Sequence, residues 1–284
     1  MSDRSSTTVM GIDLGATNVR AAVVRHGRID RTASTGVDSA GSAEKIVDQI
    51  ADVARQVWSD DVEAVGIGVP GVVDVETGVV FDVQNIPSMK EVPVKQMFEA
   101  RFHRPTFVNN DVNCFALAEC AFGKAQGRRS VAVINLGTGF AAGLVVNGAL
   151  YEGANCGAGE FGMIPYGNGI LEHYCSGLFF LRQGRDGGQV FTAAMDGQEQ
   201  ARSLWDEFGR HVGEAVKIVL FAVDPEIVIM GGSICRAYRF FEASMWASIR
   251  TFAYGRSLEH LTLELSQLDQ PGLLGAAALA AQRL

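Results

Sequence analysis

The sequence predicts a mixed α/β fold made of two related halves. The first observation is a pair of glycine–threonine turns, at 15–17 and 137–139, each lying between two apolar runs. The second is that a similar series of strands and helices accompanies each turn. Strands that alternate with amphipathic helices favour mixed sheets flanked by helices. A length of 284 residues suits two domains of ordinary size.

The first half is expected to begin with three strands, at 8–14, 18–25 and 29–34. Apolar residues spaced three and four apart then predict a helix at 42–58. A nearly continuous apolar run at 62–69 predicts a strand covered on both faces. The remaining elements expected here are a loop around Asn85, a helix near 94–102, a strand at 106–108 and a helix at 112–122.

The second half repeats this plan. Paired strands are expected at 130–136 and 140–146, followed by Asn147-Gly148, a type I′ turn signal. The later elements expected are a glycine-rich loop at 153–169, a long helix at 199–223, a buried strand at 227–230 and a last helix at 271–284. Proline at position 271 suits the first turn of that last helix.

Composition and charge restrict the class of protein. With 48% hydrophobic and 20% charged residues, the chain has a globular composition. A formal net charge of -8 makes it a poor non-specific binder of nucleic acid. The polar N-terminus lacks the apolar core of a signal peptide, and no apolar run is long enough to span a bilayer. We therefore expect a cytoplasmic protein without a membrane or nucleic-acid partner.

The two glycine turns are suited to binding an anion. Glycine lets backbone amides approach an anion closely, and successive N–H groups form a concave site. Thr17 and Thr138 each add a hydroxyl. Two such hairpins could hold the phosphates of one nucleotide between them, and two ordinary hairpins are the alternative.

Short segments at these turns resemble a known superfamily. Residues 13–17, 136–139 and 230–232 are similar to the first phosphate, second phosphate and adenosine motifs of the proteins related to hexokinase, acetate kinase, actin and the heat-shock ATPases. Within it, the chain resembles the ROK family of repressors, open reading frames and kinases. The segments that carry this narrower resemblance are 66–71, 85–87, 109–113, 157–162 and 171–177.

The resemblance implies a two-lobed, actin-like ATPase fold related to ribonuclease H, with the active site in the cleft between the lobes. We expect an N-terminal lobe of residues 1–112 plus 271–284 and a C-terminal lobe of residues 113–270. ROK kinases usually phosphorylate the 6-hydroxyl of a hexose or N-acetylhexosamine with Mg·ATP, and they usually form dimers. The expected partners are therefore ATP, Mg²⁺, a sugar and a second copy of the chain.

Asp111 is the candidate catalytic residue. It follows an apolar strand and begins a helix, so a role as helix N-cap is the alternative. A carboxylate within hydrogen-bond reach of a sugar hydroxyl can act as general base, and the ROK resemblance assigns that role to Asp111. The resemblance also implies that the sugar contacts Gly71, Asn85, Asn110, Asp111, Glu160 and Glu172.

The nucleotide residues follow from the superfamily motifs. Asp13 is expected to orient Mg²⁺, commonly through water. The phosphates are assigned to Gly15, Thr17, Gly137, Thr138 and Gly139, and the nucleoside to Gly231 and Gly232.

One departure from the family pattern concerns zinc. Many ROK proteins carry a histidine after the Gly-Glu-x-Gly segment and then a cysteine-rich zinc loop, whereas this chain has Met163 and a short loop at 164–170 without cysteine. The five cysteines form no CxxC or CxC pair, which favours buried free thiols. We therefore expect no structural zinc, and the missing histidine weakens any transfer of substrate identity.

The sequence thus predicts an ATP-dependent hexose kinase, with glucose as the first substrate. N-acetylglucosamine, N-acetylmannosamine, fructose and allose are alternatives. A repressor would carry a DNA-binding segment before Gly11, where only ten residues stand. Asp111, Thr17 and Thr138 argue against a non-catalytic sugar sensor, and the Asn-Asp and Gly-Glu pairs argue against an acyl-phosphate kinase or heat-shock ATPase.

Overall fold

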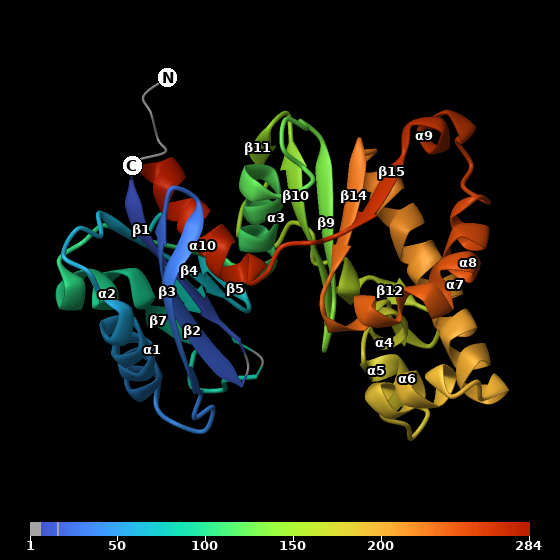
Figure 1. Ribbon diagram of the computed structural model, residues 1–284, viewed down its shortest axis with the longest axis horizontal. Coiled ribbons are helices and arrows are strands. Elements are labelled where there is room, and N and C mark those ends of the chain that lie inside the picture. The colour runs from blue at the N-terminus through green and yellow to red at the C-terminus, as the bar shows by residue number, and fades with distance from the viewer. Residues whose placement is uncertain (1–6, 16, 84) are drawn as a thin grey trace. The chain divides into compact units, whose positions relative to one another are not determined.

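The computed structural model describes residues 7–15, 17–83 and 85–284, and its mixed sheets are flanked by helices (Figure 1). This confirms the expected α/β class. The chain divides into two units, the first made of Met1–Gly127, Leu150–Ala158 and Gln267–Leu284, and the second of Arg128–Ala149 and Gly159–Ser266. The boundary expected after residue 112 falls inside helix α3 (Asp111–Phe122), which lies wholly in the first unit.

The first unit contains a five-stranded and a three-stranded sheet. Its strands are β1 (Thr8–Leu14), β2 (Asn18–Arg25), β3 (Arg28–Gly36), β4 (Ala64–Val69), β5 (Val72–Asp74), β6 (Val79–Phe81), β7 (Glu91–Pro93) and β8 (Thr106–Asn110). Its helices are α1 (Ala43–Val57), α2 (Val94–Phe102), α3 and α10 (Pro271–Arg283). The larger sheet has the order β3-β2-β1-β4-β8. β1, β2 and β3 pair antiparallel, whereas β1, β4 and β8 run parallel.

Alternation along β1 directs its side chains to two cores. Met10, Ile12 and Leu14 pack in the core that also contains the apolar face of α1. Val9 packs instead with residues of α10. The period of two therefore explains why helices cover both faces of this sheet.

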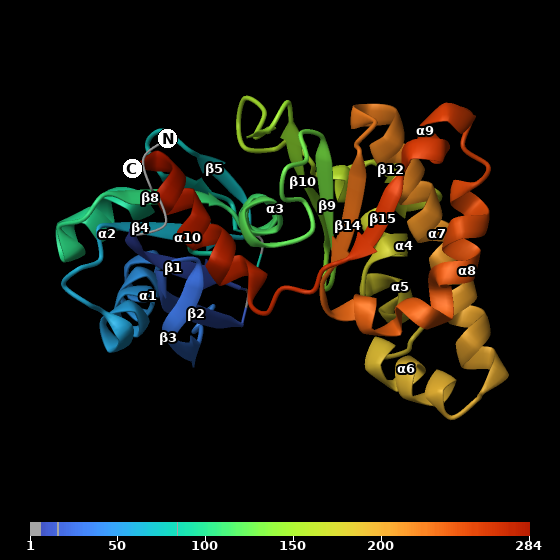
Figure 2. The ribbon, with the colours of Figure 1, turned by 45° about the horizontal axis from the view of Figure 1, so that its top comes forward.

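Helix α10 lies against β1, β4 and α3 within this unit (Figures 1 and 2). A Cβ on Gly11 would lie 2.1 Å from the Leu273 carbonyl oxygen, and one on Gly66 would lie 1.8 Å from that of Ala276. Only glycine permits backbones to approach so closely. The glycines of two neighbouring strands thus fix where α10 lies.

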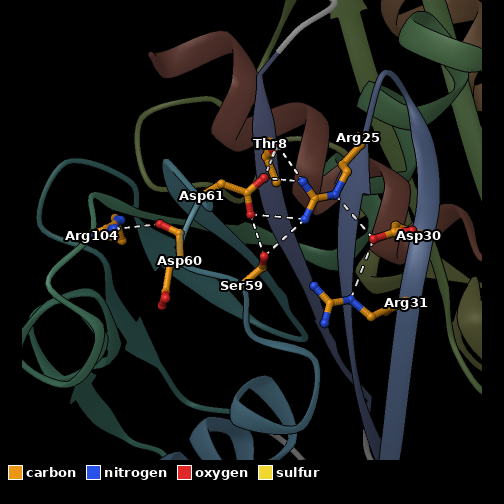
Figure 3. Close-up of polar contacts among 8 residues, drawn as sticks. All are labelled: Thr8, Arg25, Asp30, Arg31, Ser59, Asp60, Asp61 and Arg104. Carbon is orange, nitrogen blue, oxygen red and sulfur yellow. Dashed lines mark hydrogen bonds and ion pairs between the residues drawn. The ribbon is translucent and has the colours of Figure 1, made fainter.

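A polar network ties the outer ends of β1 and β2 to the connection between α1 and β4 (Figure 3). Arg25 forms an ion pair with Asp61 and donates to Ser59 Oγ at 3.1 Å. Arg25 Nε also lies 3.3 Å from Asp30 Oδ2, and Thr8 Oγ1 donates to Asp61 Oδ2 at 3.1 Å. Because this network joins residues far apart in sequence, it stabilises the tertiary arrangement at this end of the sheet.

The second unit is built on a sheet with the order β11-β10-β9-β14-β15. The strands are β9 (Val131–Leu136), β10 (Phe140–Val146), β11 (Ala149–Leu150), β12 (Pro165–Tyr166), β13 (Gly169–Ile170), β14 (Ile227–Gly231) and β15 (Thr262–Leu265). The helices are α4 (Glu172–Cys175), α5 (Leu178–Leu181), α6 (Gly187–Met195), α7 (Glu199–Val223), α8 (Tyr238–Ile249) and α9 (Gly255–His260), with 3₁₀ turns η2 (Phe161–Met163) and η3 (Ser233–Ala237).

Helices α7 and α8 lie side by side in this unit (Figure 2). A Cβ on Gly213 would lie 2.5 Å from Ser248 Cβ, so glycine lets these helices approach. In β9, β10 and β14 the unit repeats the plan of the first: β9 pairs antiparallel with β10 and parallel with β14, as β1 pairs with β2 and β4. The expected relation between the two halves is therefore present in their sheets.

Most expected elements are present with close boundaries, including β1, β2, α2 and α7. The expected loop around Asn85 is wrong in part, because β5, β6 and β7 form a small antiparallel sheet there. Strands of three residues are too short for a periodic signal. In the described part of the chain, no helix is long and apolar enough to cross a membrane.

Candidate active site

The first predicted phosphate turn closes the hairpin of β1 and β2. Gly15 N donates to Asn18 O at 2.8 Å, and Thr17 O accepts from Val37 N at 2.9 Å. Thr17 is exposed, and its hydroxyl accepts from Asn18 Nδ2 at 3.0 Å. Ala16, between them in the motif, lies outside the described residues. The turn thus presents a hydroxyl at the end of β1.

Asp13 lies near the end of β1 and is partly buried. Burial raises the pKa of its carboxyl, and the charge of Arg20 acts in the opposite direction. The carboxylate faces the start of α10, since a Cβ on Gly272 would lie 2.7 Å from Asp13 Cγ. Glycine at this position therefore lets α10 begin beside Asp13.

The register of the parallel strands brings Asp13 and the Asn-Asp segment to one edge of the sheet. Asp13 lies opposite Gly68, and Gly68 lies opposite Asn109. Neighbouring strands are about 4.8 Å apart, so the Cα atoms of Asp13 and Asn109 are separated by about 10 Å. Asp111 follows at this carboxyl edge, where open α/β sheets bind their ligands.

Asn110, and not Asp111, is the N-cap of α3. Asn110 Oδ1 accepts from Val112 N at 2.8 Å, and its Nδ2 donates to Gly71 O at 3.2 Å. These bonds bring two predicted sugar-binding residues, Asn110 and Gly71, into contact. Asp111 is partly exposed, and its Oδ1 accepts from Val112 N at 2.9 Å. The alternative role of N-cap therefore belongs to Asn110, whose sugar contact stays a prediction.

A buried network that the sequence did not indicate supports this segment. Asn109 Oδ1 accepts from Asn110 N at 2.8 Å, from Asn113 Nδ2 at 3.0 Å and from Cys156 Sγ at 3.2 Å. Asn109 Nδ2 donates to Glu152 Oε1 at 2.5 Å. Cys156 and Glu152 lie more than 40 residues further along the chain, so spacing gave no signal for these contacts. Asn85 is exposed in the β6–β7 connection, and among the described residues no hydrogen bond joins it to this network.

In the second unit, the predicted phosphate and adenosine turns lie together. They follow β9 and β14, which are parallel neighbours with Gly231 opposite Asn135. Gly232 has a φ of 94°, and a Cβ there would lie 2.2 Å from Leu136 O. Thr138 is exposed in the neighbouring turn, and a Cβ on Gly137 would meet no atom within 4 Å among the described residues.

The two predicted sugar-binding acids of this unit also lie near each other. Glu172 Oε2 accepts from Phe140 N at 2.9 Å, directly after the phosphate turn. A Cβ on Gly139 would lie 2.7 Å from the same oxygen, so that glycine makes room for Glu172. Partial desolvation of its carboxyl, and then the charge of Glu172, raise the pKa of Glu160, although the residue as a whole is exposed. Two neighbouring carboxylates can accept hydrogen bonds from several hydroxyls.

Comparison with known proteins identifies the family. The model of the ROK family matches residues 9–283. The chain belongs to the ROK family. The resemblance noted from its motifs is therefore confirmed.

Sugar kinases match over most or nearly all of the chain. The glucokinase of Thermotoga maritima is 29% identical over 97% of this chain and 98% of its own length. The N-acetyl-D-glucosamine kinase of Vibrio cholerae is 29% identical over 79% of this chain and 83% of its own. The crystal structure of a ROK family glucokinase from Streptomyces griseus, in complex with glucose and AMPPNP, has a TM-score of 0.84 at 30% identity, covering 97% of this chain and 99% of that one.

Where many ROK proteins are expected to bind zinc, this chain forms the hairpin of β12 and β13. Met163, which replaces the expected histidine, has a relative exposure of 52%. Over residues 7–15, 17–83 and 85–284, no group of three or more histidine, cysteine, aspartate or glutamate side chains is placed to hold a metal ion. All five cysteines are free thiols. Independence from zinc stays a prediction.

Proposed function

We propose that this chain transfers the γ-phosphoryl group of ATP to the 6-hydroxyl of a hexose, with Asp111 as general base. Membership in the ROK family and the kinases among its relatives make the chain an ATP-dependent sugar kinase. Glucose is the first substrate to test, because glucokinases match over 97% of the chain. N-acetylglucosamine is the alternative, on a match over 79% of it.

The proposal rests on the strand register that places Asp13, Gly68 and Asn109 opposite one another on three neighbouring strands. This register supports a site in which the carboxylate assigned to Mg·ATP and the base-bearing segment share one sheet edge, with Cα atoms about 10 Å apart across two strand spacings. A carboxylate for the metal and a second one for the hydroxyl proton are what phosphoryl transfer to an alcohol requires. Asn110 takes the capping role, so Asp111 is not needed for it.

The proposed reaction begins with a hexose whose hydroxyls donate to Glu160 and Glu172. Asp111 accepts the proton of the 6-hydroxyl as its oxygen attacks the γ-phosphorus. The bond between that phosphorus and the β,γ-bridging oxygen breaks, and ADP departs. Backbone amides and hydroxyls of the turns at Thr17 and Thr138 stabilise the phosphate oxygens, which carry the negative charge during transfer.

Asp13 fits a magnesium ion that arrives with ATP. Mg²⁺ is usually held by one or two carboxylates together with substrate phosphates and water. A single partly buried carboxylate beside the first phosphate turn meets that description. When bound, Mg²⁺ would neutralise phosphate charge. A homodimer also belongs to the proposal, and light scattering on the purified protein would test it.

Replacing Asp111 by asparagine tests the proposed base. Asp111→Asn should lower kcat with glucose by about 10²–10⁴-fold, because the amide cannot accept the proton. Hexose binding by calorimetry should persist, since the amide retains the size of the side chain. Asp52→Asn, an exposed change on α1, is the matched control and should retain wild-type kcat. A near-normal kcat in Asp111→Asn would exclude the assignment.

A further inference from the structure

Glu172 lies on a helix that is too short to be stable by itself. Helix α4 spans only Glu172–Cys175, whereas isolated helices shorter than about 12 residues are marginal in water. Its orientation must therefore come from side chains that pack against it.

Three rings from separate elements provide that packing. Tyr174 of α4 has its ring centroid 5.0 Å from Tyr166 of β12 and 4.9 Å from His211 of α7. Tyr166 and His211 also contact each other edge to face, with centroids 5.6 Å apart. We call Tyr166, Tyr174 and His211 the ring cluster. It joins the short helix to the long helix α7.

The ring cluster also contains a hydrogen bond. Tyr166 Oη lies 2.9 Å from His211 Nδ1. Burial raises the pKa of Tyr166 to about 12 and lowers that of His211. Neutral tyrosine and neutral histidine thus share one hydrogen bond, in which the imidazole tautomer decides which group donates, and His211 Nε2 lies 3.9 Å from Glu207 Oε1.

The hairpin that carries Tyr166 closes around Tyr174. Asn168 N donates to Tyr174 Oη at 3.0 Å, and a Cβ on Gly167 would lie 2.6 Å from that oxygen. Leu171 N donates to Ile164 O at 2.9 Å, which joins the two ends of the loop. The hairpin and α4 are thus held together as one piece whose orientation depends on α7.

We propose that Tyr166 and His211 are positioning residues for Glu172, and that the ring cluster sets the affinity for the hexose. The inference rests on the proposed function, in which Glu172 accepts sugar hydroxyls. The ring cluster is connected to Glu172 through Tyr174, which is only two residues away along the chain. The Glu172 carboxylate accepts from Phe140 N at 2.9 Å. A rotation of α4 would move that carboxylate, whereas the turns assigned to ATP follow β1, β9 and β14 and carry none of the three rings.

The test uses Tyr166→Phe and His211→Phe in the full chain, since each keeps a ring and removes the hydrogen bond. Each should raise the KM for the hexose about two- to tenfold, with the KM for ATP unchanged. The double variant should equal either single one, because both remove the same bond. In a Glu172→Gln background, neither change should raise the KM for the hexose further.

Trp205→Phe is the matched control for lost stability. Trp205 is buried on α7, the helix that also carries His211. Its indole nitrogen has no hydrogen-bond partner among the described residues, and its ring packs on Phe180. This variant should lower the melting temperature without changing the KM for the hexose.

The outcomes separate the inference from the proposed function. If Glu172→Gln raises the KM for the hexose while Tyr166→Phe and His211→Phe do not, the positioning role is overturned. If Glu172→Gln leaves that KM unchanged, the sugar contact of Glu172 in the proposed function fails instead, and the positioning role with it. Equal rises in both KM values would indicate a general structural defect and would also overturn the inference.

Discussion

Glycines 137 and 139 stand in one turn, and the structure gives them different reasons to be glycine. A Cβ on Gly139 would lie 2.7 Å from Glu172 Oε2, so a larger residue there would displace that carboxylate. A Cβ on Gly137 would meet no described atom within 4 Å, and Gly137 is not among the residues with positive φ. A bound phosphate is therefore the reason we propose for glycine at position 137.

Gly137→Ala should weaken ATP binding without weakening the fold. We expect the KM for ATP to rise about tenfold or more, with the melting temperature unchanged, because the methyl group occupies space proposed for phosphate. Gly255→Ala is the control, since a Cβ there also meets nothing within 4 Å among the described residues. An unchanged KM for ATP in Gly137→Ala would remove this residue from the phosphate site.

Single residues also show how far the sequence could predict the site. The Asn-Asp segment was recognisable from its motif and from the helix that it begins. The choice of Asn110 as N-cap was not, because both residue types favour that position. The contact of Glu172 with Phe140 N spans 32 residues and depends on the path of the chain, which local patterns do not encode.

At the level of elements, the start of α10 and Asp13 depend on each other. A Cβ on Gly272 would lie within 2.9 Å of both carboxylate oxygens of Asp13. Gly272→Ala should therefore displace that carboxylate and lower kcat about 10- to 100-fold. Kinetics with saturating glucose and varied Mg·ATP would measure it, with Gly255→Ala again as control. A wild-type kcat would show that Asp13 does not need this position.

The Arg25 network makes the stability of the first unit depend on pH. Hydrogen bonds from Arg25 and Ser59 lower the pKa of Asp61 well below its usual range. A lowered pKa contributes stability above the unfolded carboxyl value of about 3.9, and that stability is lost as the pH falls toward the folded value. Asp30 and Asp61 are exposed and Arg25 is partly exposed, so salt should weaken the effect.

Arg25→Gln should therefore lower the melting temperature at pH 6 to 8, and its difference from wild type should shrink below about pH 4. Arg31→Gln is the matched control, because Arg31 contacts only Asp30 in this network, at 3.6 Å (Figure 3). Thermal melts from pH 3 to 8 would measure both. A deficit that stays constant across this range would contradict the assignment of the effect to Asp61.

Elements were predicted best where the hydrophobic pattern extends over many residues. The expected helix at 199–223 is α7, and α1 lies one residue inside each expected end, with Ser42 as its N-cap. The strands of two or three residues, such as β5 and β12, were not found because their pairing is decided by tertiary contacts rather than by local pattern.

Across the whole molecule, the two five-stranded sheets share one plan, and each has its glycine turn at the end of its central strand. β1 and β9 each pair antiparallel with the strand after the turn and parallel with a later strand. This common plan made the class predictable from sequence, because the two turns and the alternating elements repeat in order. The boundary between the units was not, because residues 150–158 belong to the first unit although they follow β10.

The stability of the whole molecule should not depend on zinc. Zinc binds thiolate and unbonded imidazole nitrogen, but burial raises the pKa of Cys175 well above its usual value. His173 Nδ1 accepts from Arg182 Nη1 at 2.7 Å, and the loop at 164–170 is held by the ring cluster. Elemental analysis should find well below one zinc per chain, and a chelator should leave both the melting temperature and the KM for the hexose unchanged. Stoichiometric zinc whose removal lowers the melting temperature would show that other ligands complete a site and that the ring cluster alone does not hold the loop.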